Sequence, residues 1–161
     1  MKNILIETKV AQYAYDELPS EYRQLVDIAK GNTQTAYAPY SRFHVGAAVL
    51  LENGEIIGGN NQENSASPTT LCAERVAMFY ANSQFPEVAP KAIAIAAFTN
   101  GSYLQSPITP CGSCRQVLLE TEQRYGKPIE VILYGSEKVY VIQNVKQLLP
   151  LCFEKSSLEI G

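Results

Sequence analysis

Three of the four cysteines stand in segments whose spacing suits metal binding. Cys111 and Cys114 form a Cys-x-x-Cys pair, and Cys72 lies earlier in the chain, two residues before Glu74. Thiolates bind zinc well, and a Cys-x-x-Cys pair at the start of a helix can place two sulfurs on one ion. Such a pair alone is equally compatible with a redox or structural role. The third cysteine, followed by a carboxylate, favours a metal site.

Glu74 is the candidate for proton transfer beside that site. Three protein ligands leave the fourth position of tetrahedral zinc open to water, which distinguishes a catalytic site from a closed structural one. Residues two apart on a regular helix point about 200° apart. Glu74 can therefore reach the metal only if Cys72 caps a helix and Glu74 lies in its first turn. A noncatalytic zinc module is the alternative, but it has no use for the adjacent carboxylate.

The elements that must position these residues follow from the apolar spacing. Helices are predicted over residues 19–36, 72–81 and 110–126. The predicted strands are residues 43–51, 56–57, 91–98, 129–134 and 139–142. Residues 91–98 form a continuous apolar run that is typical of a central strand covered on both faces. A last short helix is expected from Asn144 to Leu149. This order predicts an α/β fold with a five-stranded mixed sheet covered by helices.

Composition limits the kind of protein. The chain has 161 residues, of which 46% are hydrophobic and 18% charged, and this composition is typical of a single compact domain over residues 1–161. We expect its core at about residues 20–153, after an N-terminal extension over residues 1–18. The net charge of -3 offers no basic surface for nucleic acid. No apolar run reaches the roughly 20 residues that span a bilayer. These features predict a cytoplasmic protein with a small-molecule partner, without nucleic-acid or membrane binding.

Beyond the cysteines, two longer segments carry a family resemblance. Cys72-Ala73-Glu74-Arg75 and Pro110-Cys111-Gly112-Ser113-Cys114-Arg115-Gln116-Val117 resemble the zinc site of the small homotetrameric cytidine deaminases. The general zinc-deaminase pattern is His or Cys, then x-Glu, then Pro-Cys-x-x-Cys. In this sequence the first position of the pattern is a cysteine, Cys72, and in this respect the chain resembles the tetrameric cytidine deaminase branch. The resemblance also includes residues 40–48, 61–64 and 148–153, and so covers about residues 37–153.

This resemblance implies a fold, a cofactor and an activity. The fold would be a three-layer αβα sandwich, and the chain would assemble as a homotetramer. One zinc ion per chain would be held by Cys72, Cys111 and Cys114. The reaction would be the hydrolytic deamination of cytidine and deoxycytidine to uridine and deoxyuridine, with release of ammonia, in pyrimidine salvage. Glu74 would carry the protons between water, ring N3 and the departing amine.

The resemblance also gives roles to residues around the metal and the substrate. Arg75 would draw charge from the thiolates, and Gln116 would add a supporting hydrogen bond. Asn61 and Glu63 would bind the ribose hydroxyls. Phe43 would pack beside the pyrimidine, and Ala73 would also contact the substrate. The residues alone leave other interpretations open: Arg75 as a surface arginine, residues 60–64 as a solvated polar turn, and Phe43 as a core side chain.

Two further residues attract attention without a role in the reaction. His44 is the only histidine in the chain. It lies on a predicted strand, away from the ligand segments in sequence, so we expect a solvated or packing role. Cys152 lies in an apolar stretch, and we expect an inert buried thiol.

The sequence departs from the family pattern at three places. Ser67 stands where many members have Tyr, and Phe153 lacks the Gly-Pro that often follows it. These positions touch neighbouring subunits in the family. The loop over residues 99–109 is longer than usual and can reshape the rim of the pocket.

Two other deaminase types compete with the cytidine deaminase interpretation. A deaminase of a cytosine-containing antibiotic such as blasticidin S is the nearest alternative, but it differs around Asn61, Glu63 and Arg75. A polynucleotide-editing deaminase would need a basic groove with aromatic platforms. This acidic chain offers no obvious one.

Overall fold

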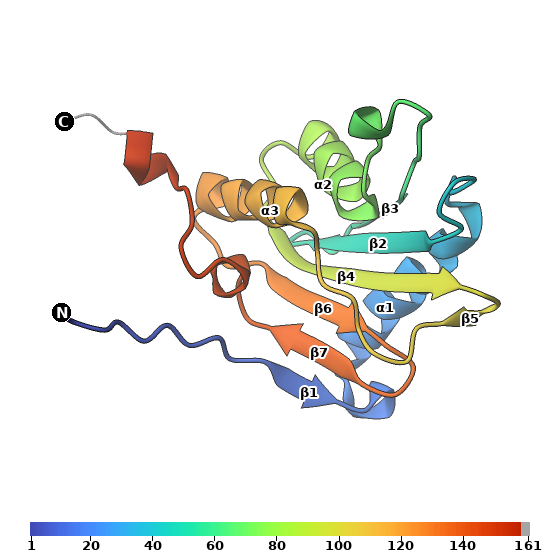
Figure 1. Cartoon of the computed structure of the whole chain (residues 1–161), viewed down its shortest axis with the longest axis horizontal. Helices are drawn as coiled ribbons and strands as arrows, with labels where there is room; N and C mark the ends of the chain where they lie inside the picture. The colour runs from blue at the N-terminus through green and yellow to red at the C-terminus, as the bar shows by residue number, and fades with distance from the viewer. Residues whose placement is uncertain (159–161) are drawn as a thin grey trace.

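The computed structural model describes residues 1–158 (Figure 1). The helices are α1 (Ser20–Asn32), α2 (Ala73–Gln84) and α3 (Gly112–Tyr125). The strands are β1 (Ala11–Tyr13), β2 (His44–Leu51), β3 (Ile56–Asn60), β4 (Pro90–Thr99), β5 (Ser102–Tyr103), β6 (Glu130–Tyr134) and β7 (Val139–Ile142). Short 3-10 turns are η1 (Tyr15–Glu17), η2 (Thr33–Thr35), η3 (Ser67–Thr69), η4 (Val145–Leu148) and η5 (Lys155–Leu158).

Within residues 1–158 the strands form one seven-stranded mixed sheet. The order is β1-β7-β6-β4-β2-β3, and β5 pairs with the end of β4. β4 pairs in parallel with β6 and antiparallel with β2. The predicted mixed sheet and its central strand are therefore confirmed. The prediction of five strands is wrong by two, because β1 and β5 are too short to show a period in the sequence.

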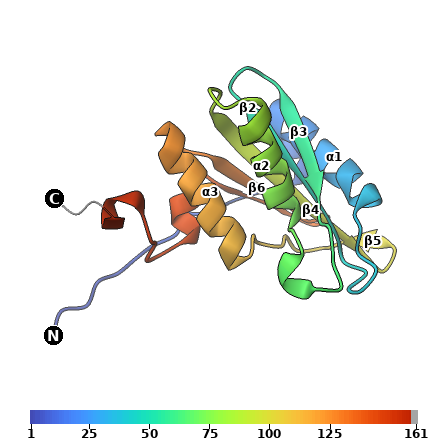
Figure 2. The ribbon, with the colours of Figure 1, turned by 90° about the horizontal axis from the view of Figure 1, so that it is seen from above.

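Helices cover both faces of the sheet, as Figure 2 shows: α1 lies on one face, and α2 and α3 lie on the other. Consecutive side chains of β4 point to opposite faces, with alanines toward α1 and isoleucines toward α2 and α3. The alanines are Ala92, Ala94 and Ala96, and the isoleucines are Ile93 and Ile95. This alternation explains why the strand reads as a continuous apolar run. In the described part of the chain, no helix is long and apolar enough to cross a membrane.

The N-terminal segment reaches the sheet before α1 begins. Residues 1–10 are exposed and lead to β1, which pairs antiparallel with β7 at the edge of the sheet (Figure 1). Leu18 is buried against the face that α1 covers. Residues 11–18 of the expected extension are thus integrated into the sheet and its core.

The long connection after β4 turns sharply and adds the short strand β5. Asn100 and Gly101 have positive φ values of 50° and 81°, and they close a hairpin between β4 and β5. The Tyr103 hydroxyl in β5 donates a hydrogen bond of 3.1 Å to the Lys30 carbonyl in α1. The loop expected over residues 99–109 is therefore held at its first turn by a hydrogen bond to α1.

The Lys30 ammonium lies among three tyrosine rings. It is 5.3 Å from the ring centroids of Tyr15 and Tyr103 and 4.9 Å from that of Tyr134. Such distances allow cation–π attraction. The three rings come from η1, β5 and β6, so this contact connects the N-terminal segment, the hairpin and the sheet to α1.

The helix boundaries follow local rules. Cys72 caps α2 with extended backbone, as the position of Glu74 required, and Gly126 ends α3 in the left-handed conformation, with φ 64°. The last predicted helix is a 3-10 turn, η4, and the Asn144 side chain before it accepts a hydrogen bond from the Gln147 N–H. Under α2, Gly59 of β3 leaves no room for a side chain: a Cβ there would lie 2.6 Å from the Ala77 nitrogen. Strand β3 and helix α2 therefore meet backbone to backbone.

Candidate metal centre

The N-termini of α2 and α3 bring three thiols together on the face of the sheet that these two helices cover. Cys72 caps α2, Cys111 caps α3, and Cys114 lies in the first turn of α3. Their sulfurs all lie within 4.8 Å of one another, and those of Cys72 and Cys111 are 3.7 Å apart. The positive ends of two helix dipoles favour thiolates at this place. The structure therefore joins the three cysteines that the sequence selected as ligands.

In this cluster, the pKa values of the thiols depend on one another and on the neighbouring Arg75 cation. A hydrogen bond with the Cys114 thiol, aided by the Arg75 guanidinium, lowers the pKa of Cys72 to about 5. The same thiol–thiol bond raises the pKa of Cys114. The Arg75 Nη2 is 3.6 Å from the Cys72 sulfur and 3.3 Å from the Thr70 carbonyl oxygen. The guanidinium is therefore placed where it can offset negative charge on sulfur, which is the role that the family resemblance implies for Arg75.

Glu74 lies in the first turn of α2, directly after the Cys72 cap. Only 5% of the residue is exposed, and burial raises the pKa of its carboxyl. The Cys72 sulfur adds to this effect through charge repulsion. A carboxyl that keeps its proton above the usual range is suited to exchanging protons near neutral pH.

A cavity of about 400 Å³ opens over the Cys72 and Cys111 thiols and the Glu74 carboxyl. Phe43, Asn61 and Glu63 line it together with Cys72, Glu74 and Cys111. Sequence reasoning missed six other lining residues, which are Ser41, Val45, Thr70, Leu71, Ile108 and Thr109. Most are small or apolar and carry no chemical signal by themselves. Only the fold reveals that they share a surface with the reactive groups.

Asn61 and Glu63 hold the backbone on one side of this cavity. The Asn61 amide oxygen accepts a hydrogen bond from the Val45 N–H at 2.8 Å, and its amide nitrogen donates to the Phe43 carbonyl at 2.9 Å. Glu63 accepts hydrogen bonds from the backbone N–H groups of Tyr40 and Ser41. Hydrogen bonding from Ser41 lowers the pKa of the Glu63 carboxyl. These contacts fix the segment that carries the half-buried Phe43 ring.

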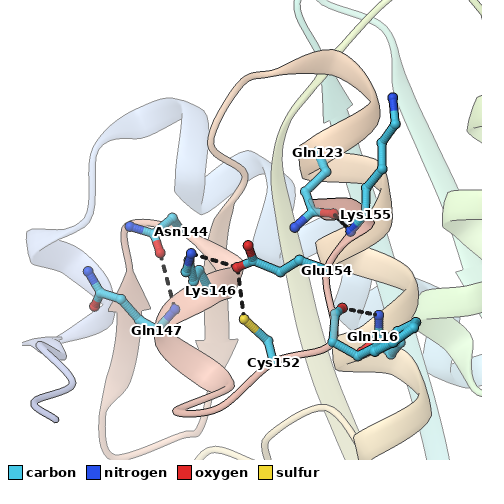
Figure 3. Close-up of polar contacts among 9 residues, drawn as sticks. Gln116, Gln123, Asn144, Lys146, Gln147, Cys152, Glu154 and Lys155 are labelled. Atoms are coloured by element: carbon cyan, nitrogen blue, oxygen red, sulfur yellow. Dashed lines mark hydrogen bonds and ion pairs between the residues drawn. The ribbon is translucent and has the colours of Figure 1, made fainter. Parts of the chain in front are cut away.

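Four of the predicted site residues do not line the cavity. Cys114 and Arg75 still belong to the thiol cluster, whereas the side chains of Gln116 and Ala73 lie elsewhere. The Gln116 amide donates a hydrogen bond of 3.0 Å to the Phe153 carbonyl, and so holds the C-terminal segment rather than a cysteine (Figure 3). The Ala73 side chain is fully buried in the core between α2 and the sheet. The partner of Gln116 lies 37 residues away in the chain, which no local pattern could indicate.

The remaining histidine and cysteine lie apart from the thiol cluster. His44 lines a separate small cavity with Phe98 and Tyr103. Cys152, on the segment after η4, packs against the core but is only partly buried, so the expectation of a buried thiol holds only in part. The Cys152 thiol donates a hydrogen bond of 2.9 Å to Glu154, which also pairs with Lys146 at 2.6 Å (Figure 3). Bonding to Glu154 raises the pKa of Cys152 and keeps this thiol protonated.

A helix-covered sheet that joins a Cys-x-Glu segment to a Pro-Cys-x-x-Cys segment beneath one cavity places the chain among the zinc-dependent deaminases. Comparison with known families narrows this class. Residues 19–125 match the model of the cytidine and deoxycytidylate deaminase zinc-binding region, and the chain belongs to this family.

Individual relatives agree with this assignment. A cytidine deaminase from Sporosarcina psychrophila is 39% identical over 146 residues, covering 86% of this chain and 95% of the relative. The crystal structure of cytidine deaminase from Burkholderia pseudomallei superposes with a TM-score of 0.68 at 40% identity, covering 82% of this chain and 98% of that one. A blasticidin-S deaminase from Bacillus cereus is 26% identical over 135 residues, covering 83% of this chain and 92% of that protein. The comparisons therefore favour the cytidine deaminase interpretation over the antibiotic alternative.

Proposed function

We propose that this protein is a zinc-dependent cytidine deaminase that converts cytidine and deoxycytidine, with water, to uridine and deoxyuridine and ammonia. The observation that carries this proposal is the single cavity that Cys72, Glu74 and Cys111 share with Asn61 and Glu63. It offers metal donors, a proton carrier and polar groups for a sugar on one surface. Family membership agrees with this chemistry.

The donor set fits zinc. Three thiols within 4.8 Å of one another, with a guanidinium beside one sulfur, suit a soft divalent ion with one open position. We assign Cys72, Cys111 and Cys114 as the ligands of one zinc ion per chain. When bound, zinc makes water acidic enough to act as a nucleophile at neutral pH.

Glu74 would move the protons of the reaction. Its carboxyl takes a proton from the attacking water, protonates ring N3 so that C4 becomes electrophilic, and delivers a proton to the amine as ammonia leaves. The C4–O bond forms, the C4–N bond breaks, and no redox change is needed. Burial of Glu74 supports this role, because a carboxyl shielded from solvent exchanges its proton with the substrate instead of with bulk water.

The opposite wall of the cavity would hold the nucleoside. Phe43 would pack against the pyrimidine ring, since aromatic rings favour stacked or edge contacts. The Glu63 carboxylate would accept hydrogen bonds from the ribose hydroxyls, and the Asn61 amide would donate hydrogen bonds to them. Their hydrogen bonds to residues 40–45 support this role, because they hold both groups in place before the substrate arrives.

We further propose a homotetramer that works in the cytoplasm in pyrimidine salvage. Large aromatic side chains on the surface support assembly: Phe79 and Tyr80 of α2 are 49% and 55% exposed, and Phe153 is 61% exposed. Exposed apolar side chains that cluster on one surface mark protein interfaces. The net charge of -3 supports a small-molecule partner over nucleic acid.

The decisive experiment measures turnover and zinc on the same sample. We expect the absorbance of cytidine and of deoxycytidine to fall as uracil forms, with about one zinc per chain. Zinc without turnover of either nucleoside, together with turnover of blasticidin S, would replace the proposed substrate. Absence of zinc from protein prepared without chelators would contradict the mechanism.

A further inference from the structure

Arg115 follows Cys114, the last cysteine of the cluster, and each of its three guanidinium nitrogens donates a hydrogen bond to a nearby group. Its Nε donates to the Pro110 carbonyl at 2.8 Å, its Nη1 to the Leu148 carbonyl at 2.8 Å, and its Nη2 to the Thr109 hydroxyl at 3.0 Å. Arginine presents these donors in a rigid planar fork, so three bonds fix the relative position of their acceptors.

Two of these three acceptors belong to the segment that leads into Cys111. Thr109 lines the cavity, and Pro110 directly precedes the cysteine. The third acceptor, Leu148, ends the turn η4 and is part of the core under α3. Arg115 therefore ties the segment before the ligand to a buried part of the fold.

The two cysteines of α3 depend on this connection to different degrees. Cys114 is fully buried and lies within the helix, so the core fixes its place. Cys111 is exposed and caps the helix, so its sulfur follows the backbone of residues 109–111. Binding and catalytic constellations lose affinity when their groups move by about 0.5 Å.

We propose that Arg115 is a positioning residue that sets the place of the Cys111 sulfur and of the cavity wall at Thr109. It thereby determines zinc affinity and substrate affinity together. The inference rests on the proposed function for the identity of the metal and of the substrate. Lysine cannot replace this arginine, because one ammonium cannot reach three acceptors in a fixed plane.

The test measures zinc affinity by competition with a chelating dye, in folded wild-type protein and in Arg115→Gln and Arg115→Lys variants. We expect a loss of roughly 10- to 100-fold for Arg115→Gln, the range seen when a residue that orients a metal ligand is removed. Arg115→Lys should lose affinity as well, but less. In zinc-saturated enzyme, both variants should raise KM for cytidine more than they lower kcat.

Two residues on the same helix provide matched controls. Arg124→Gln removes an arginine at the other end of α3, where the guanidinium donates to the Pro86 carbonyl. Glu122→Gln weakens a purely structural contact, since Glu122 accepts hydrogen bonds from the Ile129 and Val145 N–H groups at 3.0 and 2.8 Å. Glu122→Gln should lower the free energy of unfolding without changing zinc affinity, and Arg124→Gln should leave zinc affinity and KM unchanged.

The outcomes separate this inference from the proposed function. Unchanged zinc affinity and KM in Arg115→Gln, or an equal loss of zinc affinity in Glu122→Gln, would overturn the positioning role. If Arg115→Gln does not fold, wild-type zinc affinity in Arg115→Lys would overturn it instead. A wild-type protein that binds zinc but does not deaminate cytidine would defeat the proposed function and leave the zinc comparison valid.

Discussion

At the scale of single residues, Glu74 is in an unusual environment. Carboxyl groups are rarely this buried unless they are paired, yet Glu74 is 5% exposed and lies beside thiols. The nearby cation, Arg75, contacts the Cys72 sulfur. An apolar side chain would serve stability better at this place, so the retained carboxyl supports a chemical role.

Glu74→Gln should lower the kcat for cytidine by about 100- to 10,000-fold, the usual contribution of a positioned general acid and base. The amide keeps the shape of the side chain, so the zinc content should not change. Metal analysis and steady-state kinetics of the same preparation measure both quantities.

Glu130→Gln is the matched control for this change. Burial also raises the pKa of the Glu130 carboxyl, but Glu130 lies on β6 and does not line the cavity. Its substitution should leave kcat unchanged. Wild-type turnover in Glu74→Gln would show that another group carries the protons.

The residue-scale predictions succeeded where a local rule decides geometry. The spacing of Cys72 and Glu74 required a cap and a first turn, and backbone geometry at a helix start supplies both. The partner of Gln116 and the exposure of Cys152 depend on where the chain after η4 lies. That path depends on contacts between distant segments, which the sequence pattern does not contain.

At the scale of elements, the length of a helix or strand decides whether the sequence predicts it. The ends of the predicted segments 43–51, 91–98 and 110–126 lie within two residues of β2, β4 and α3. Long segments with a regular spacing of apolar residues define such elements without tertiary information. Strands β1 and β5 have three and two residues. They exist because β7 has a free edge and because the end of β4 extends beyond its pairing with β6.

The turn η1 carries a pH-dependent contact between the N-terminal segment and α1. Tyr15 donates a hydrogen bond of 2.7 Å to Asp27, and burial together with this bond raises the pKa of Tyr15 from 10.0 to about 12. The folded state therefore favours the protonated phenol. Its stabilisation is complete below pH 10, the unfolded pKa, and is lost as the pH rises toward 12.

Urea unfolding of wild-type and Tyr15→Phe protein at several pH values measures this effect. The difference in unfolding free energy should be constant below pH 10 and should shrink between pH 10 and about 12. Because both proteins share every other titrating group, their common loss of stability in alkali cancels in the difference. A difference that does not depend on pH would contradict the role of the phenol proton.

At the scale of the whole molecule, the proposed homotetramer can be tested at the exposed aromatic side chains of α2, Phe79 and Tyr80. If Phe79 is buried between subunits of the proposed tetramer, Phe79→Glu should reduce the molar mass measured by light scattering, because burying an unpaired charge is costly. Activity per chain should fall as the variant is diluted. Ile4→Glu, on the exposed segment before β1, should change neither quantity. Wild-type protein that stays monomeric and fully active would contradict the tetramer.

The backbone contact between Gly59 and Ala77 has a consequence for how such a site can evolve. Asn61 follows β3 and Glu74 lies in the first turn of α2, so main-chain packing sets the separation between the wall proposed to bind the sugar and the proposed proton carrier. Side-chain replacement cannot adjust that separation without displacing the helix. Changes in substrate size are left to the rim, where Ile108 and Thr109 belong to a connection that tolerates insertion. Backbone packing thus fixes the floor of the cavity, and substitutions can change the size of the cavity only at its rim.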